Sequence, residues 1–78
     1  MTATMIAPQV ASDQALLIAR LDGEKAYRQL IGFRIEITLQ NDGWHVDYEL
    51  PLTGVQGGGP HYIIDADSGA IIWKRYDQ

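Results

Sequence analysis

The chain has 78 residues, a net charge of −4 and no cysteine. A chain of this length forms one domain and buries only about 60–65% of its unfolded surface, so its core must be small. The lack of cysteine excludes disulfides, a thiolate zinc site and a thiol nucleophile. The six Lys and Arg residues are scattered, which argues against nucleic acid as a partner because phosphates favour clustered cations.

No segment approaches the roughly 20 apolar residues that a membrane-spanning helix needs. The first residues also lack the basic region of a signal peptide. We therefore expect no membrane association and a cytoplasmic location, or a periplasmic one if an export signal precedes the sequence shown. Residues 1–11 are predicted to be a flexible leader, and residues 12–78 a single domain.

The first predicted elements are helical. Ser12 or Asp13 can cap a helix, since a short side-chain oxygen accepts hydrogen bonds from first-turn N–H groups, and the segment DQALLIARL follows. Gly23 suits the left-handed position that ends a helix, and Asp22 suits the cap of a second helix, GEKAYRQLI. We therefore predict two short helices, or one helix broken near Gly23, with Gly32 ending the helical region.

Two strands with alternating apolar and polar residues are predicted next. Their apolar positions are Phe33, Ile35, Ile37, Leu39, Trp44, Val46, Tyr48 and Leu50. Such alternation indicates antiparallel strands with one buried face. A two-residue turn at Asp42-Gly43 would pair Leu39 with Val46, and a four-residue turn would pair Leu39 with Trp44. Both keep the apolar residues on one face, whereas a three-residue loop would not and is rejected.

Pro51 ends the second strand, because it has no N–H to donate to a β-ladder. The segment LTGVQGGGP is predicted to be a loop, HYIID a third strand, ADSG a turn and AIIWKRY a fourth strand. The expected fold class is α+β, an N-terminal helical segment packed on a four-stranded antiparallel meander. The expected core comprises Phe33 and Trp44 under Leu16, Leu17 and Leu30.

Two glycine-containing motifs resemble ligand sites, but we interpret both as structural. A phosphate loop leads into a helix and carries a Lys, whereas Gly57–Gly59 leads into Pro60 and a strand. These glycines would allow positive φ or close backbone approach. In DADSG, Gly69 stands where a calcium loop needs an oxygen ligand, and no Glu follows. We predict a turn, with Asp67-Ser68 right-handed and Gly69 left-handed.

The second strand carries His45, Asp47 and Glu49 on one face, with Glu36 nearby on the first strand. Imidazole and carboxylate groups can hold a divalent metal. However, side chains at i, i+2 and i+4 spread over ~13 Å of strand and do not converge. We interpret this set as a solvated polar face, and we predict no metal, no cofactor and no catalytic residue.

Large amphipathic side chains near the C-terminus are the other candidates. Tyr, Trp and Arg are enriched in binding hot spots. Trp73 suits the core and the surface equally, while Tyr76 near the terminus suits the surface. The predicted partner-binding residues are therefore Glu36, His45, Asp47, Glu49, Trp73 and Tyr76.

Over residues 15–76, the motifs ALLIA, GWHVDYELP and GGGPHYIIDADSGAI occur in this order. This order resembles the small bacterial NTF2-fold immunity proteins of polymorphic toxin systems. It is also similar to PepSY-type domains, which end in a comparable Asp-containing hairpin with Ser or Thr before Gly. Both resemblances imply a cystatin-like layout, a helix cradled by a curved antiparallel sheet, and non-enzymatic binding or inhibition.

The leading hypothesis is a small non-catalytic protein-binding domain, such as an immunity protein that occupies a toxin. Its face with Glu36, Asp47 and Glu49 would meet a basic partner. One alternative is a PepSY-like module that binds or restrains a peptidase. Another is a small-ligand-binding cystatin-like domain with a cavity lined by His45 or His61. A homodimer formed by the fourth strand across a two-fold axis is a further alternative.

Overall fold

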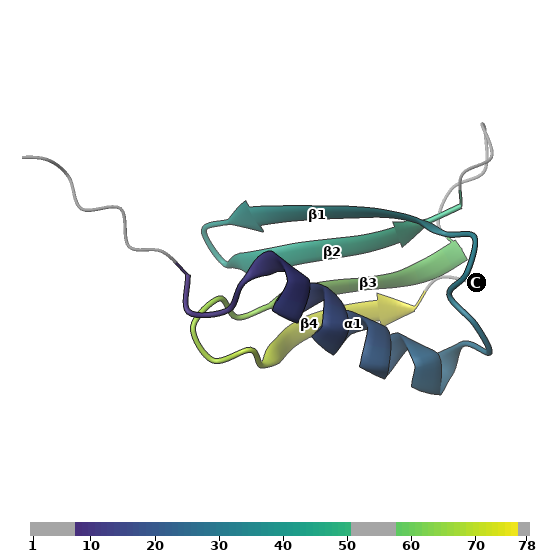
Figure 1. Ribbon diagram of the computed structural model, residues 1–78, viewed down its shortest axis with the longest axis horizontal. Coiled ribbons are helices and arrows are strands. Elements are labelled where there is room, and N and C mark those ends of the chain that lie inside the picture. The colour runs from purple at the N-terminus through teal and green to yellow at the C-terminus, as the bar shows by residue number, and fades with distance from the viewer. Residues whose placement is uncertain (1–7, 51–57, 77–78) are drawn as a thin grey trace, which may run out of the picture.

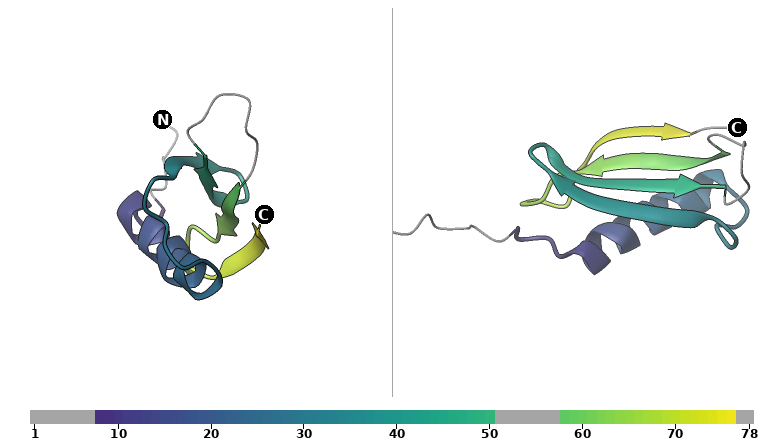
Figure 2. Two further views of the ribbon diagram at one scale, coloured as in Figure 1. Left: turned by 90° about the vertical axis from the view of Figure 1, so that its right-hand side faces the viewer. Right: turned by 90° about the horizontal axis from the view of Figure 1, so that it is seen from above.

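The computed structural model describes residues 8–50 and 58–76, which form one helix and four strands. These elements are α1 (Ser12–Ala26), β1 (Arg34–Gln40), β2 (Gly43–Glu49), β3 (Gly58–Ile64) and β4 (Ile71–Tyr76). The strands form one antiparallel sheet in the order β1-β2-β3-β4, and α1 lies across one face of it (Figure 1; Figure 2). The predicted α+β class, a helical segment on an antiparallel meander, is confirmed. We call the sheet face away from α1 the outer face.

The helical region is one helix, so the prediction of two helices or a break was wrong. α1 runs through Gly23, which is buried inside the helix rather than at its end. A Cβ atom on Gly23 would lie 3.0 Å from Leu30 Cδ1 and 3.3 Å from Pro60 Cγ. Glycine suits this position because the helix approaches β3 closely. Of the residues predicted as a second helix, 23–31, the first four belong to α1 and residues 27–31 are not helical.

The start of α1 also differs from the prediction. The N-cap is Ala11, not Ser12 or Asp13. The Ala11 N–H donates a hydrogen bond to Gln14 Oε1 at 2.9 Å, so the acceptor of the capping bond is a side chain within the first turn of the helix. The helix has 15 residues, and no helix in the described residues is both long and apolar enough to cross a membrane.

Val10, upstream of the helix, is packed into the domain. It is 8% exposed, its N–H donates to the Ala66 carbonyl at 2.9 Å, and its carbonyl accepts from Trp44 Nε1 at 2.8 Å. The packed unit therefore includes Val10, although the domain was expected to start at residue 12. Residues 1–7 of the expected leader lie outside the described residues.

The pairing of β1 with β2 follows one of the two predicted registers. Leu39 lies opposite Trp44, Ile37 opposite Val46, and Ile35 opposite Tyr48. The turn is shorter than expected for that register, because Gln40 and Gly43 pair and leave only Asn41-Asp42 between them. The apolar residues of both strands therefore share the helix-facing side of the sheet, as the alternation predicts.

Glycine lets β3 begin earlier than predicted. Residues 58–60, expected in a loop, already belong to the strand. Gly58 has φ of 89°, next to a shift in register, and a Cβ atom on Gly59 would lie 2.4 Å from the Tyr48 carbonyl oxygen. The predicted structural role of these two glycines is confirmed, while Gly57 lies outside the described residues.

A turn joins β3 to β4, as the sequence predicts. The Asp65 carboxylate accepts hydrogen bonds from the backbone N–H groups of Asp67 and Ser68, each at 2.8 Å. These bonds hold the pKa of Asp65 below its ordinary value, and the bond from Ser68 has the larger effect. Gly69 has φ of 80°, which is the left-handed conformation that the sequence predicts.

The core is built on small residues of α1. Ala15 and Ala19 are 0% exposed and, with Gly23, form the buried side of the helix. The remaining core residues are Val10, Val46, Tyr48, Tyr62 and Ile64. The placement predicted for Leu17 was wrong, since this side chain is 53% exposed. The other expected core residues are partly buried around this cluster: Leu16, Leu30, Phe33 and Trp44.

Candidate functional site

Five of the six predicted partner-binding residues lie on the outer face. Across the sheet, Glu36, Asp47, His61 and Arg75 form one row, and Thr38, His45, Ile63 and Trp73 form the next. Glu49 shares this face because it lies two residues after Asp47 on β2. Trp73 therefore joins Glu36, His45, Asp47 and Glu49, whereas Tyr76 projects from the helix-facing side, where it reaches Asp22 of α1.

The carboxylates of the outer face are partnered within the chain. Arg34 Nη2 donates to Glu36 at 2.9 Å and to Glu49 at 2.7 Å. The hydrogen bond from Arg34 holds the pKa of Glu49 below its ordinary value. Since these side chains are 36–61% exposed, the pairs contribute little stability. They do reduce the negative charge that this face presents to a partner.

Both histidines contact an aspartate. His61 Nδ1 lies 2.7 Å from Asp47 Oδ1, and His61 is only 8% exposed although it belongs to the outer face. His45 Nε2 lies 2.6 Å from Asp42 Oδ1, and this contact lowers the pKa of Asp42. Asp47 therefore pairs with His61, whereas His45 pairs with Asp42, so His45 and Asp47 do not act together. Among residues 8–50 and 58–76, no group of three or more His, Cys, Asp or Glu side chains could hold a metal ion.

Trp73 is the large apolar side chain of β4 on the outer face. It is 44% exposed, and the Arg75 guanidinium carbon lies 5.9 Å from the centre of its ring. This distance allows a cation–π contact. A half-exposed indole with a guanidinium beside it has the composition of an interaction hot spot.

On the helix side, a polar cluster joins α1 to β3 and β4. We call Asp22, Tyr62, Lys74 and Tyr76 the Asp22 cluster. The Asp22 carboxylate accepts hydrogen bonds from the Tyr62 hydroxyl at 2.9 Å, from Lys74 Nζ at 3.2 Å and from the Tyr76 hydroxyl. Its side chain is 15% exposed.

Two effects oppose each other on the pKa of Asp22. Burial raises it, but the bonds from Tyr76, Tyr62 and Lys74 outweigh burial, so the pKa lies below its ordinary value. Burial, together with the bond to Asp22, raises the pKa of Tyr62. The charged form of Asp22 is therefore the one that the fold stabilises.

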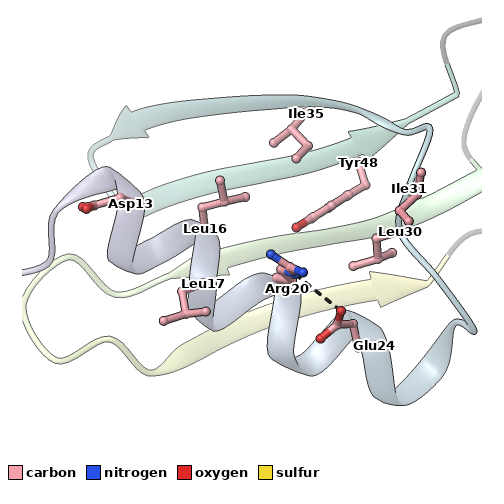
Figure 3. Close-up of a pocket in the computed structure, with 9 residues that line it drawn as sticks. All are labelled: Asp13, Leu16, Leu17, Arg20, Glu24, Leu30, Ile31, Ile35 and Tyr48. Atoms are coloured by element: carbon pink, nitrogen blue, oxygen red, sulfur yellow. Dashed lines mark hydrogen bonds and ion pairs between the residues drawn. The ribbon is translucent and has the colours of Figure 1, made fainter.

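A groove lies between α1 and the β1 side of the sheet (Figure 3). Its volume is about 440 Å³. Its apolar lining consists of Leu16, Leu17, Leu30, Ile31, Ile35 and Tyr48, and its charged lining of Asp13, Arg20 and Glu24. Neither histidine lines this groove. The groove is therefore not the cavity lined by His45 or His61 that would have favoured a small-ligand-binding domain. We call this feature the α1–β1 groove.

Sequence reasoning missed both the Asp22 cluster and the α1–β1 groove. The cluster joins residues that are 40 to 54 positions apart, and no local pattern shows such a contact. The groove depends on which strands the helix covers. One signal was available: Leu17 and Leu21 lie on the side of the helix opposite Ala15, Ala19 and Gly23, because two residues correspond to about 200°. If the small residues face the sheet, the two leucines must therefore point away from it.

The chain matches no protein-family model, no curated protein and no solved structure in comparisons with known proteins. The resemblances to immunity proteins and to PepSY-type domains therefore remain expectations from the sequence.

Proposed function

We propose that this chain is a non-catalytic protein-binding domain and that the outer face of the sheet is its contact surface. The single observation that carries the proposal is Trp73, half exposed beside Arg75 on a face that α1 leaves uncovered. Aromatic and Arg side chains supply much of the energy in protein interfaces. Trp73 is thus placed to enter a partner's pocket, and the polar residues around it are placed to form a rim.

The charge of the outer face favours a basic partner. Glu36, Asp47 and Glu49 place three carboxylates on it, against the two guanidinium groups of Arg34 and Arg75. The chain as a whole carries −4. Because Arg34 partly neutralises the acids, the charge serves mainly to speed association, and Trp73 supplies more of the affinity.

Inhibition of a toxin and restraint of a peptidase, which the two resemblances imply, are both uses of such a surface. The identity of the partner separates them. A stoichiometric loss of toxin activity on mixing would favour an immunity protein, and the same effect on a peptidase would favour a PepSY-like module.

The test uses the purified products of the neighbouring genes as partners in calorimetric titrations. We expect Trp73→Ala to weaken binding by at least about 30-fold, the effect of losing a hot spot of roughly 2 kcal/mol. A Glu36→Gln/Glu49→Gln variant should bind more slowly and with a weaker dependence on salt. Lys25→Ala, on the exposed surface of α1, is the matched control and should bind like the wild type. Equal affinity of the Trp73→Ala variant and the wild type would refute the proposal.

A further inference from the structure

Two apolar surfaces on the helix side of the domain have no partner within the described residues. The first is a convex ridge on α1 formed by Leu17 and Leu21, which are 53% and 55% exposed. The second is concave, and consists of the α1–β1 groove with the inner face of β1, where Ile35 and Leu39 are 39% and 44% exposed. Ile31, at the end of the groove (Figure 3), is 85% exposed. Surfaces of this kind mark interaction sites.

The concave surface exists because one helix is too narrow for this sheet. Neighbouring strands lie about 4.8 Å apart, and a helix with its side chains is about 10–12 Å across, so one helix covers two or three strands. α1 packs against β2, β3 and β4. The inner face of β1 therefore has room beside α1 for a second helix.

We propose that the second helix is α1 of another copy of this chain. A two-fold axis along the helices places α1 of each copy side by side in one layer, between the two sheets. The ridge of each copy then packs on the groove and β1 of the other. One symmetry operation covers both apolar surfaces of both copies, and the contact closes as a dimer instead of continuing into a fibre.

Charge on the groove rim is compatible with this arrangement. Arg20 and Glu24 form an exposed pair at 3.4 Å, with side chains 63% and 44% exposed. A two-fold axis along the helices makes them parallel, so Arg20 and Glu24 of one copy stand level with the same residues of the other, and Arg20 can reach Glu24 across the interface only diagonally, about one turn along the axis. The ridge and the inner face of β1 carry no charge of their own.

A second copy explains more than an unrelated helix would. A foreign helix in the groove would cover Ile35 and Leu39 and would contact Leu17, which also lines the groove, but it would leave Leu21 exposed. The dimer also differs from the pairing of fourth strands considered from the sequence, because it leaves β4 and both outer faces free. It therefore does not rest on the proposed function.

The test measures the dimer dissociation constant of the full chain by sedimentation velocity over a concentration series. Leu21→Glu alters the ridge alone, since Leu21 does not line the groove, and Ile35→Glu alters the groove alone. Each change occurs twice in a dimer, so each should raise the dissociation constant at least ~100-fold, as expected for apolar side chains of this size. Thr38→Glu, on the outer face of the same strand, is the matched control and should leave the constant unchanged.

Mixing the two variants gives the decisive result. The ridge of the Ile35→Glu copy and the groove of the Leu21→Glu copy are both intact, so the mixed dimer regains one of its two contacts. We expect it to form with a dissociation constant at least about 10-fold lower than that of either variant alone. If either variant loses its circular dichroism spectrum, Leu21→Ser and Ile35→Thr replace the pair.

Cross-linking gives an independent readout, since the chain has no cysteine of its own. When equal amounts of the Leu21→Cys and Ile35→Cys variants are mixed under oxidising conditions, we expect the mixed disulfide to exceed the two symmetric ones added together, which random pairing would only equal. A wild type that stays monomeric at millimolar concentration, a mixture no stronger than its components, or an equal effect of Thr38→Glu would each overturn the proposal.

Discussion

The two flanks of α1 meet the sheet in opposite ways. On the β4 flank, Asp22 accepts hydrogen bonds from Tyr62 at 2.9 Å, Lys74 at 3.2 Å and Tyr76. On the β1 flank, leucine and isoleucine side chains line an open groove of about 440 Å³ (Figure 3). One flank is polar and closed, and the other is open and mainly apolar, with Asp13, Arg20 and Glu24 as its charged lining.

This difference shows how the position of the helix is fixed. Hydrogen bonds to one carboxylate are directional, so the Asp22 cluster sets where α1 lies, while Ala15, Ala19 and Gly23 allow it to lie close. Apolar contacts are not directional and would accept a helix shifted toward β1. Because one helix cannot cover all four strands, holding it at the β4 side leaves the open groove at the β1 side.

Filling the space beneath the helix should break this arrangement most strongly. We expect Gly23→Leu to destabilise the fold by about 3 kcal/mol, because the new side chain would meet Leu30, Pro60 and the Tyr62 hydroxyl. Lys25→Leu, on the exposed side of the same turn, is the control and should change stability by less than about 0.5 kcal/mol. Urea denaturation measures both, and similar values for the two variants would contradict the close approach.

Removing the charge of the Asp22 cluster comes next. We expect Asp22→Asn to cost about 2 kcal/mol, since it weakens hydrogen bonds to a charged acceptor and leaves Lys74 without its carboxylate. Asp13→Asn is the matched control, because Asp13 is an exposed carboxylate of the same helix. If the two variants denature at the same urea concentration, the cluster does not fix the helix.

The same carboxylate should make stability depend on pH. The pKa of Asp22 in the folded state lies below its ordinary value of 3.8, so the unfolded chain binds more protons as the pH falls through that value. The stabilisation is therefore complete well above pH 3.8 and is lost as the pH falls through the folded-state pKa. Between pH 7 and pH 3, the free energy of unfolding should fall less for Asp22→Asn than for the wild type. Part of the pH dependence should remain in both proteins, because the pKa values of Asp65 and Glu49 are also lowered by folding. Parallel curves would contradict this assignment.

The smallest effect is expected at the open flank. Ile31 is 85% exposed, so Ile31→Ser should change the free energy of unfolding of the monomer by no more than about 0.5 kcal/mol. The measurement is made at low protein concentration, where no dimer contributes. A loss comparable to that of Asp22→Asn would mean that the groove is filled within the chain itself.

The fold was predictable where one short pattern settles it. Alternation in β1 and β2 limits the pairing to registers that keep Ile37 and Val46 on one face, and Gly69 marks its turn. The same alternation places Glu36, His45, Asp47 and Glu49 together. It could also have separated Trp73 from Tyr76, because residues three apart on a regular strand face opposite sides.

The remaining features depend on distant residues. Gly23 was read as a helix end because its reason for being glycine lies in Leu30, Pro60 and Tyr62. The partners of Asp22 come from β3 and β4, and the groove depends on which strands α1 covers. A local sequence pattern indicates which conformation a residue favours, but it does not show which distant residues contact it in the folded chain.

The Asp22 cluster also has a consequence for the order of folding. Each strand bonds to the one next to it in sequence, whereas Asp22 closes loops of 40, 52 and 54 residues. Longer loops lose more entropy on closing, so the hairpins should assemble before the helix docks. Interactions that form after the rate-limiting step of folding change the unfolding rate and leave the folding rate nearly unaffected. Loss of this carboxylate should therefore shorten the lifetime of the native state while leaving the refolding rate almost unchanged.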